Sequence, residues 1–218
     1  MRALPRNVAS RGRQARLRGG LRTHGKVAVL DLTQYNKGAG DEAGTWSWDG
    51  ADDMKLNGYD GAGISAQGNL NIGVTGTNTV TADSLQSAIE VKDGNLAITG
   101  EGTLNATAEP QKSRSAVKVE CGSLAISGDV TLNATAGTDT IAVSGDGKTG
   151  GDVDIRGANV NVTATNKVPH TIGIHTRAGN ITINEGAAVH AAADGGVRCR
   201  CSLCRKHLLR AWRLHRGG

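Results

Sequence analysis

The sequence lacks phenylalanine, and aromatic residues make up only 2% of its 218 residues. Aromatic rings dominate the cores of ordinary globular domains, so their scarcity favours a narrow interior filled by smaller apolar side chains. No apolar stretch reaches the roughly 20 residues that a membrane-spanning helix needs. The 32 glycines follow no Gly-X-Y period, which excludes a collagen-like fold.

Acidic residues are absent from both ends of the chain. Residues 1–26 contain eight basic residues, and residues 197–218 contain seven. All 20 carboxylates and the other ten basic residues lie in 27–196, which gives this part a formal charge of −10. A basic chain suggests nucleic acid or anionic membranes as partners. Here that inference applies to the ends, and we expect no nucleic-acid partner for the middle.

The middle of the chain repeats the phrase Gly-Asn-Leu-x-Ile in five variants. They begin at Gly68, Gly94, Gly122, Gly151 and Gly179, in steps of 26, 28, 29 and 28 residues. Such a period is typical of a stack of supersecondary units, none of which can bury its apolar face alone.

Each repeat contains three short runs that alternate with period two, as strands with one buried face do. In one repeat the inward set is Ile89, Val91, Leu96, Ile98, Leu104 and Ala106. Three strands per repeat predict one coil of a parallel β-helix, stacked at about 4.8 Å. A β-sandwich also has many short strands, but it gives no reason for the same triplet to recur. We therefore predict an all-β, single-stranded parallel β-helix of about five to six coils.

The composition divides the chain into four parts. Residues 1–26 form a basic arm, expected to be disordered, without the apolar core or cleavage pattern of a secretory signal. Residues 27–61 form an N-terminal cap and first coil, and residues 62–196 the β-helix repeats. Residues 197–218 interrupt the repeat abruptly. We interpret this basic tail either as the product of a shifted reading frame or as a short helix that caps the last coil.

The tail contains a metal-like spacing, Cys199-x-Cys201-x2-Cys204-x2-His207. Three thiols and an imidazole have the right chemistry for tetrahedral zinc. The spacing is more compressed than paired C-x2-C knuckles, which favours an incidental cluster over a zinc site.

Three aromatic residues gather before the repeats: Trp46, Trp48 and Tyr59. Their rings could stack on sugars, or they could plug the N-terminal end of the apolar core, and the second interpretation is favoured. Alternation places Trp46 and Trp48 on the same side of a strand, which serves either purpose.

A polar ladder is expected on the outward side of the third strand of each coil. Asn105, Asn133 and Asn161 recur there, and the pattern extends to Thr81 at one end and His190 at the other. Stacked amides commonly bond to one another, so a structural role is favoured. The same row could instead contact a polysaccharide, or ordered water as on ice-binding solenoids.

Catalytic signals are weak. A β-helix lyase would need converging carboxylates for Ca²⁺ and a cationic group. Asp152 and Asp154, with Arg156, alternate on one predicted strand and are the nearest approach to such a site. A solvated charge cluster is the favoured interpretation, so we expect no enzyme and, at most, Ca²⁺ at Asp152 and Asp154.

The phrases TWSWDGADDMKLNGYDG, GNLNI and SAIEVKDGNLAITGEGTLNATA resemble the β-helical carbohydrate-binding-like repeat domains of Gram-positive bacterial surface proteins. The resemblance covers roughly residues 27–194. It implies a right-handed β-helix at the cell surface and binding of acidic or cellulosic plant polysaccharides, with Ca²⁺ assisting through surface carboxylates.

Three functional hypotheses follow. The first is a monomeric, non-catalytic polysaccharide-binding module, for which Trp46, Trp48, Tyr59 and the three ladder asparagines are the candidate residues. The second is a structural spacer or adhesin stalk without a ligand, which unbroken ladders and the lack of a concave aromatic patch would favour. The third is a pectate-lyase-like polysaccharide lyase.

Overall fold

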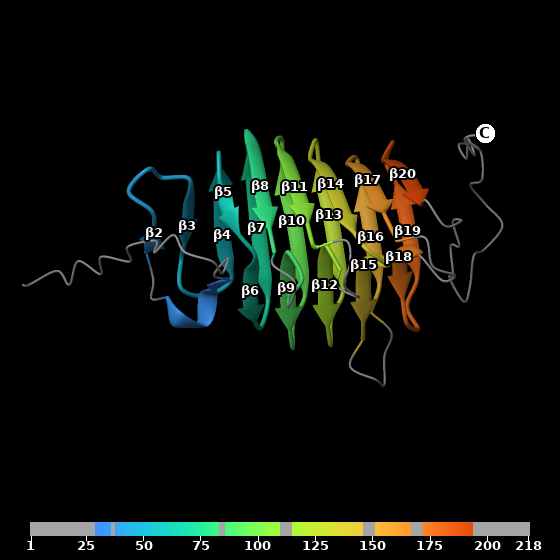
Figure 1. Ribbon diagram of the computed structural model, residues 1–218, viewed down its shortest axis with the longest axis horizontal. Coiled ribbons are helices and arrows are strands. Elements are labelled where there is room, and N and C mark those ends of the chain that lie inside the picture. The colour runs from blue at the N-terminus through green and yellow to red at the C-terminus, as the bar shows by residue number, and fades with distance from the viewer. Residues whose placement is uncertain are drawn as a thin grey trace, which may run out of the picture.

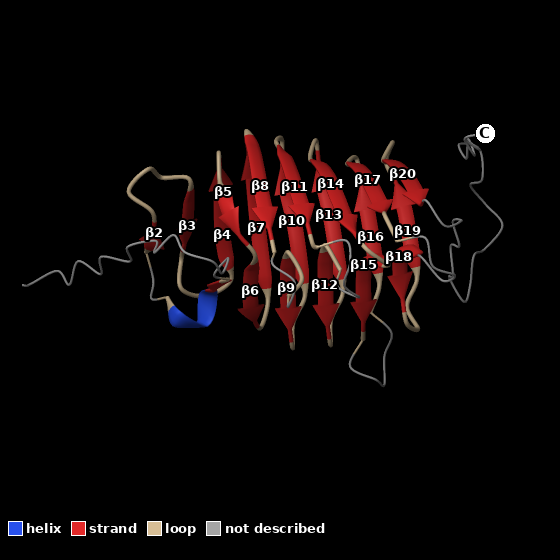
Figure 2. Ribbon diagram, in the orientation of Figure 1, coloured by secondary structure: helices blue, strands red, loops and turns tan. Residues whose placement is uncertain are grey.

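The computed structural model describes residues 29–35, 38–82, 86–109, 115–145, 151–166 and 172–193. Apart from the short 3-10 helix η1 (Leu32–Gln34), the regular elements among them are β-strands. The strands stack side by side into an elongated rod (Figures 1 and 2). The basic arm and the tail with its predicted zinc residues lie outside the described residues.

Three sheets form the faces of the rod. Sheet A has six strands: β1 (Leu30–Asp31), β6 (Ile64–Gln67), β9 (Ile89–Lys92), β12 (Val117–Glu120), β15 (Asp139–Ser144) and β18 (Ile172–Thr176). Sheet B has eight: β2 (Ala39–Gly40), β3 (Trp46–Trp48), β4 (Asp53–Asn57), β7 (Leu70–Thr75), β10 (Leu96–Gly100), β13 (Leu124–Gly128), β16 (Val153–Arg156) and β19 (Ile181–Asn184). Sheet C has six: β5 (Asp60–Ala62), β8 (Thr77–Thr81), β11 (Thr103–Thr107), β14 (Thr131–Ala136), β17 (Asn159–Ala164) and β20 (Ala188–Ala193).

The chain visits the three sheets in the order A, B, C and then repeats. Within each sheet, strands of successive coils pair in parallel, as β10 does with β13 and β11 with β14. This confirms the predicted all-β parallel β-helix. The six strands of sheet A and of sheet C agree with the predicted number of coils.

The repeated apolar residues form the core in register. Leu96 pairs with Leu124 and Ile98 with Ile126, and all four are at most 1% exposed. Fully burying such a side chain contributes about 1.5–3 kcal/mol. Because one coil stacks on the next with the same residue at the same position, a narrow core can be filled without large aromatic rings.

The glycine of the repeated phrase is required by close approach of backbones. A β-carbon on Gly94 would overlap the backbone of Gly68, and one on Gly122 would overlap Gly94. The same holds for Gly151 against Gly122 and for Gly179 against Gly151. At this corner each coil stacks directly on the glycine of the preceding coil, and only a residue without a side chain fits.

The residue after each of these glycines belongs to a corner ladder, which was not predicted from the sequence. Its members are Asn69, Asn95, Ser123, Asp152 and Asn180. The backbone N–H of each member after Asn69 donates to the side-chain oxygen of the member before it, at distances from 2.7 to 3.0 Å. The ladder therefore joins successive coils at the point where the backbones are closest.

The N-terminal end departs from the parallel pattern. Strand β3 runs antiparallel to β4 and β2 runs antiparallel to β3, so sheet B ends in two antiparallel pairings. Trp48 pairs with Met54 and Trp46 with Leu56. The two tryptophans lie over the end of the apolar core, where an uncapped coil would expose it.

Candidate functional site

The outward face of sheet A carries most of the interacting charge among the described residues. Parallel pairing aligns the outward residues of successive strands: Ser65 with Glu90, Glu90 with Lys118, and Lys118 with Ala142. Ala142 in turn aligns with His175. A row of polar and charged side chains, interrupted by Ala142, therefore crosses the sheet at one position per strand.

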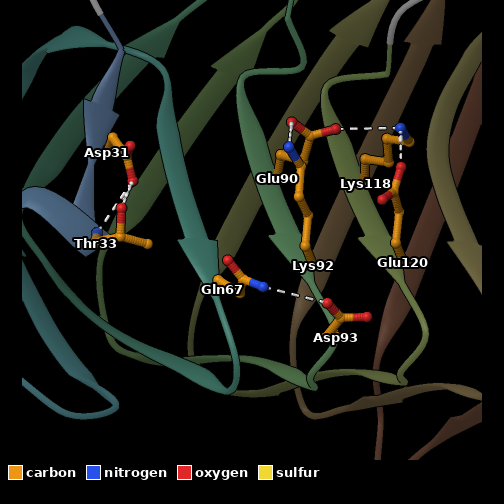
Figure 3. A network of polar contacts seen from close by, with 8 residues as sticks. All are labelled: Asp31, Thr33, Gln67, Glu90, Lys92, Asp93, Lys118 and Glu120. Atoms are coloured by element: carbon orange, nitrogen blue, oxygen red, sulfur yellow. Dashed lines mark hydrogen bonds and ion pairs between the residues drawn. The ribbon is translucent and has the colours of Figure 1, made fainter.

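Lys118 lies at the centre of an ion-pair network (Figure 3). Its Nζ is 3.1 Å from Oε1 of Glu90, and it also pairs with the carboxylate of Glu120. Lys92 lies 3.9 Å from the other oxygen of Glu90, whose side chain is only 15% exposed. Burial by itself lowers the pKa of Lys118, but its hydrogen bonds to Glu120 and Glu90 raise that pKa above its ordinary value. The lysine is therefore held charged at the middle of the face.

Two shallow, open hollows lie on this face and meet at Lys118. The first has a volume of about 540 Å³ and is lined by Val29, Asp31, Ser65, Gln86, Glu90, Lys92, Lys118 and Glu120. The second has a volume of about 330 Å³ and is lined by Ser87, Ser115, Lys118, Asp139, Ala142, Ser144, His175 and Arg177. Together they reach from β1 to β18.

Two polar side chains of the second hollow, Asp139 and Ser87, lie in surroundings that do not satisfy them fully. Burial raises the pKa of Asp139, and the charge of His175 partly opposes this rise. The hydroxyl of Ser87 is buried and has no hydrogen-bond partner among the residues the structure describes. An unsatisfied buried hydroxyl costs about 1–3 kcal/mol.

The predicted aromatic residues do not line either hollow. Trp48 and Tyr59 are 6% and 8% exposed, and Trp46 packs partly buried against the same core. The ring of Trp46 also makes an edge contact with Tyr35, with ring centroids 5.3 Å apart. Trp48 and Tyr59 therefore present no open ring face to a sugar. Their placement matches the alternative interpretation, in which they plug the end of the core.

The predicted asparagine ladder is present on sheet C. Nδ2 of Asn133 donates to Oδ1 of Asn105, and Nδ2 of Asn161 donates to Oδ1 of Asn133, both at 2.8 Å. His190 extends the row as expected, but at the other end the predicted neighbour was wrong. Asn105 pairs with Thr79, because the register places Thr81 opposite Thr107.

Asp152 and Asp154 belong to two separate networks. Asp152 precedes β16 and accepts the N–H of Asn180 in the corner ladder, at 2.7 Å. Asp154 lies on β16 and forms an ion pair with Arg156 at 2.7 Å. In the described part of the chain, no three His, Cys, Asp or Glu side chains form a group that could hold a metal ion. Calcium binding by these two residues stays a prediction.

Cys199, Cys201, Cys204 and His207 lie outside the described residues, so the structure does not place the predicted zinc ligands. Of the helices in the described ranges, none is long and apolar enough to cross a membrane. No protein-family model, curated protein or solved structure matches the chain.

The hollows of sheet A were not predicted from the sequence. Their residues come from the six strands of sheet A and the segments beside them, spaced along 149 positions from Val29 to Arg177. The sequence contained one signal for a distinct face. Outward positions in the strands of sheet A, such as Glu90, Lys118 and Glu120, are charged, whereas outward positions in the strands of sheet C are mostly Thr or Asn.

Proposed function

We propose that the protein is a non-catalytic polysaccharide-binding module, and that the glycan lies along the outer face of sheet A. The observation that carries the proposal is the pair of open hollows that meet at Lys118 and extend across the sheet. An elongated, open and polar surface suits a chain of sugars, which presents hydroxyl groups at regular intervals. Under this proposal the rod is displayed at a bacterial cell surface, as the resemblance implies.

The polar groups of this face support the proposal. Five interstrand spacings at about 4.8 Å give the sheet a width of about 24 Å, enough for several consecutive sugar rings. Carboxylates, hydroxyls, ammonium and imidazole groups alternate across that width. Together they can accept and donate the hydrogen bonds that sugar hydroxyls need. The ion pairs of Lys118 with Glu90 and Glu120 hold three of these groups in fixed positions before a ligand arrives.

A direct test is binding of the purified chain to a glycan array, with and without a calcium chelator. For any glycan that binds, we expect Ser144→Trp, which fills the second hollow, to weaken binding at least tenfold. The matched control is Ser127→Trp, the same change at a half-buried outward serine of sheet B. It should leave the affinity unchanged. Equal losses in both variants would place the glycan elsewhere on the rod.

The chelator arm separates the calcium prediction from glycan binding itself. Loss of binding on chelation supports a role for Ca²⁺, and binding that persists removes Ca²⁺ from the proposal. The lyase hypothesis is checked in the same preparation by the absorbance of unsaturated products on pectin.

A structural spacer is the second candidate function. Two observations favour it: the Asn105–Asn133–Asn161 ladder is unbroken, and Trp48 and Tyr59 are buried in the cap. A spacer needs regular coil-to-coil bonds and no ligand. Failure of the folded chain to bind any glycan, with or without chelator, would support the spacer over the module.

A further inference from the structure

The outer face of sheet C consists of threonine and asparagine alone across four adjacent strands. Its twelve outward positions on β8, β11, β14 and β17 are Thr77, Thr79, Thr81, Thr103, Asn105, Thr107, Thr131, Asn133, Thr135, Asn159, Asn161 and Thr163. The strands pair in register, so these residues form three straight rows across the sheet. The four strands lie side by side along the rod (Figure 1).

The rows form a two-dimensional array with fixed spacings. Neighbouring residues within a row are about 4.8 Å apart. Neighbouring rows are about 6.6 Å apart, since their residues lie two positions apart along a strand. Threonine is stiff at its first side-chain torsion because it is β-branched. The central asparagines are held by the two 2.8 Å hydrogen bonds between their side-chain amides. The hydroxyl, methyl and amide groups are therefore ordered before anything binds.

The array is uncharged and ends at ionisable residues on both sides. Asp60 on β5 aligns with Thr79, and His190 on β20 aligns with Asn161. The outer face of sheet A differs sharply, because ion pairs occupy its centre. A charged group orders water radially around itself, whereas neutral hydroxyls and methyls can share water in a planar network. Sheet C therefore has the surface chemistry that a regular water layer requires.

We propose that this face, the Thr/Asn array, orders water into a lattice and binds the surface of ice crystals. The hydroxyls and amides of the array anchor the first water layer, and the threonine methyls occupy the gaps between those waters. A crystal surface, which repeats in two directions, matches an array that repeats in two directions, whereas an isolated soluble glycan would need only one row. This proposal uses a different face from the glycan proposal and does not depend on it.

The test uses the whole purified chain in two assays: inhibition of ice recrystallisation and shaping of single ice crystals near their melting point. We expect the unmodified chain to be active in both. Thr107→Lys and Thr135→Lys, which place long charged side chains within the array, should each abolish activity. Thr99→Lys is the matched control, because Thr99 is an outward threonine of β10 on sheet B. It should keep full activity, and circular dichroism verifies that every variant is folded.

Three results would overturn the proposal. One is a folded chain without effect on ice in either assay. Another is equal loss of activity in Thr99→Lys, which would remove sheet C as the responsible face. The third is that the chain binds insoluble cellulose and that Thr107→Lys abolishes this binding but leaves the effect of the chain on ice unchanged. The array would then be a surface for crystalline polysaccharide.

Discussion

The backbone of Gly94 occupies the space that a β-carbon on Gly122 would need. We expect Gly122→Ala to lower the free energy of unfolding by at least about 2 kcal/mol, since the stacked coils must move apart to accommodate the methyl group. Gly73→Ala is the matched control: its β-carbon would meet its nearest atoms at 3.8 and 3.9 Å, which is ordinary contact. Urea unfolding measures both, and equal stabilities would contradict the close approach at this corner.

The amide ladder predicts coupling between Asn105 and Asn133. Replacing either by alanine removes the 2.8 Å bond between them, so the second replacement should cost less than the first. In a double-mutant cycle, we expect a coupling free energy of about 0.5–1.5 kcal/mol. Strict additivity would show that the hydrogen bond between Asn105 and Asn133 contributes no net stability.

The ion-pair network predicts an alkaline loss of stability. The pKa of Lys118 is raised in the folded protein, so its contribution is complete below its ordinary value of 10.5 and disappears as the pH rises through the higher folded value. Lys118→Met should cost about 1 kcal/mol at neutral pH and weaken that alkaline dependence. Lys55→Met, at an exposed lysine of sheet B, is the control. Melting temperatures across the alkaline range measure both, and parallel curves for the two variants would count against the network.

Tyr59 should ionise late. Burial, followed by nearby negative charges, raises its pKa to about 12, and its hydroxyl donates to the carbonyl of Ala62 at 2.9 Å. The neutral phenol is therefore favoured in the folded state, and its stabilising effect is lost as the pH rises above about 10 towards 12. Ultraviolet titration should detect one late phenol. Tyr59→Phe should remove that step and cost about 1 kcal/mol; an unchanged titration would contradict the assignment.

Trp48 should matter for stability and not for glycan binding. Because it is 6% exposed over the end of the core, Trp48→Ala should cost about 3–5 kcal/mol, and Trp48→Phe less. Either variant, if folded, should bind any ligand of the unmodified chain with the same affinity. A large loss of affinity in folded Trp48→Phe would show that the cap takes part in ligand binding.

The strand triplet, its period and its inward residues followed from the sequence. Alternation with period two identified Leu96 and Ile98 as inward, and a period near 28 residues required their counterparts Leu124 and Ile126 to stack on them. This was sufficient because in a solenoid nearly every contact is between equivalent residues of neighbouring coils. The asparagine ladder was predicted for the same reason.

The tertiary structure decided what the repeat does not specify. The partner of Asn105 is Thr79 and not Thr81, because Asn105 follows Thr79 by 26 residues, the same step that separates the paired Leu70 and Leu96 in sheet B. The antiparallel strands β2 and β3 lie outside the repeat. The hollows of sheet A depend on how Glu90, Lys118 and His175 from separate coils align across parallel strands. Periodicity determines the shape of this rod, but the outward side chains acquire their neighbours only when the coils are stacked.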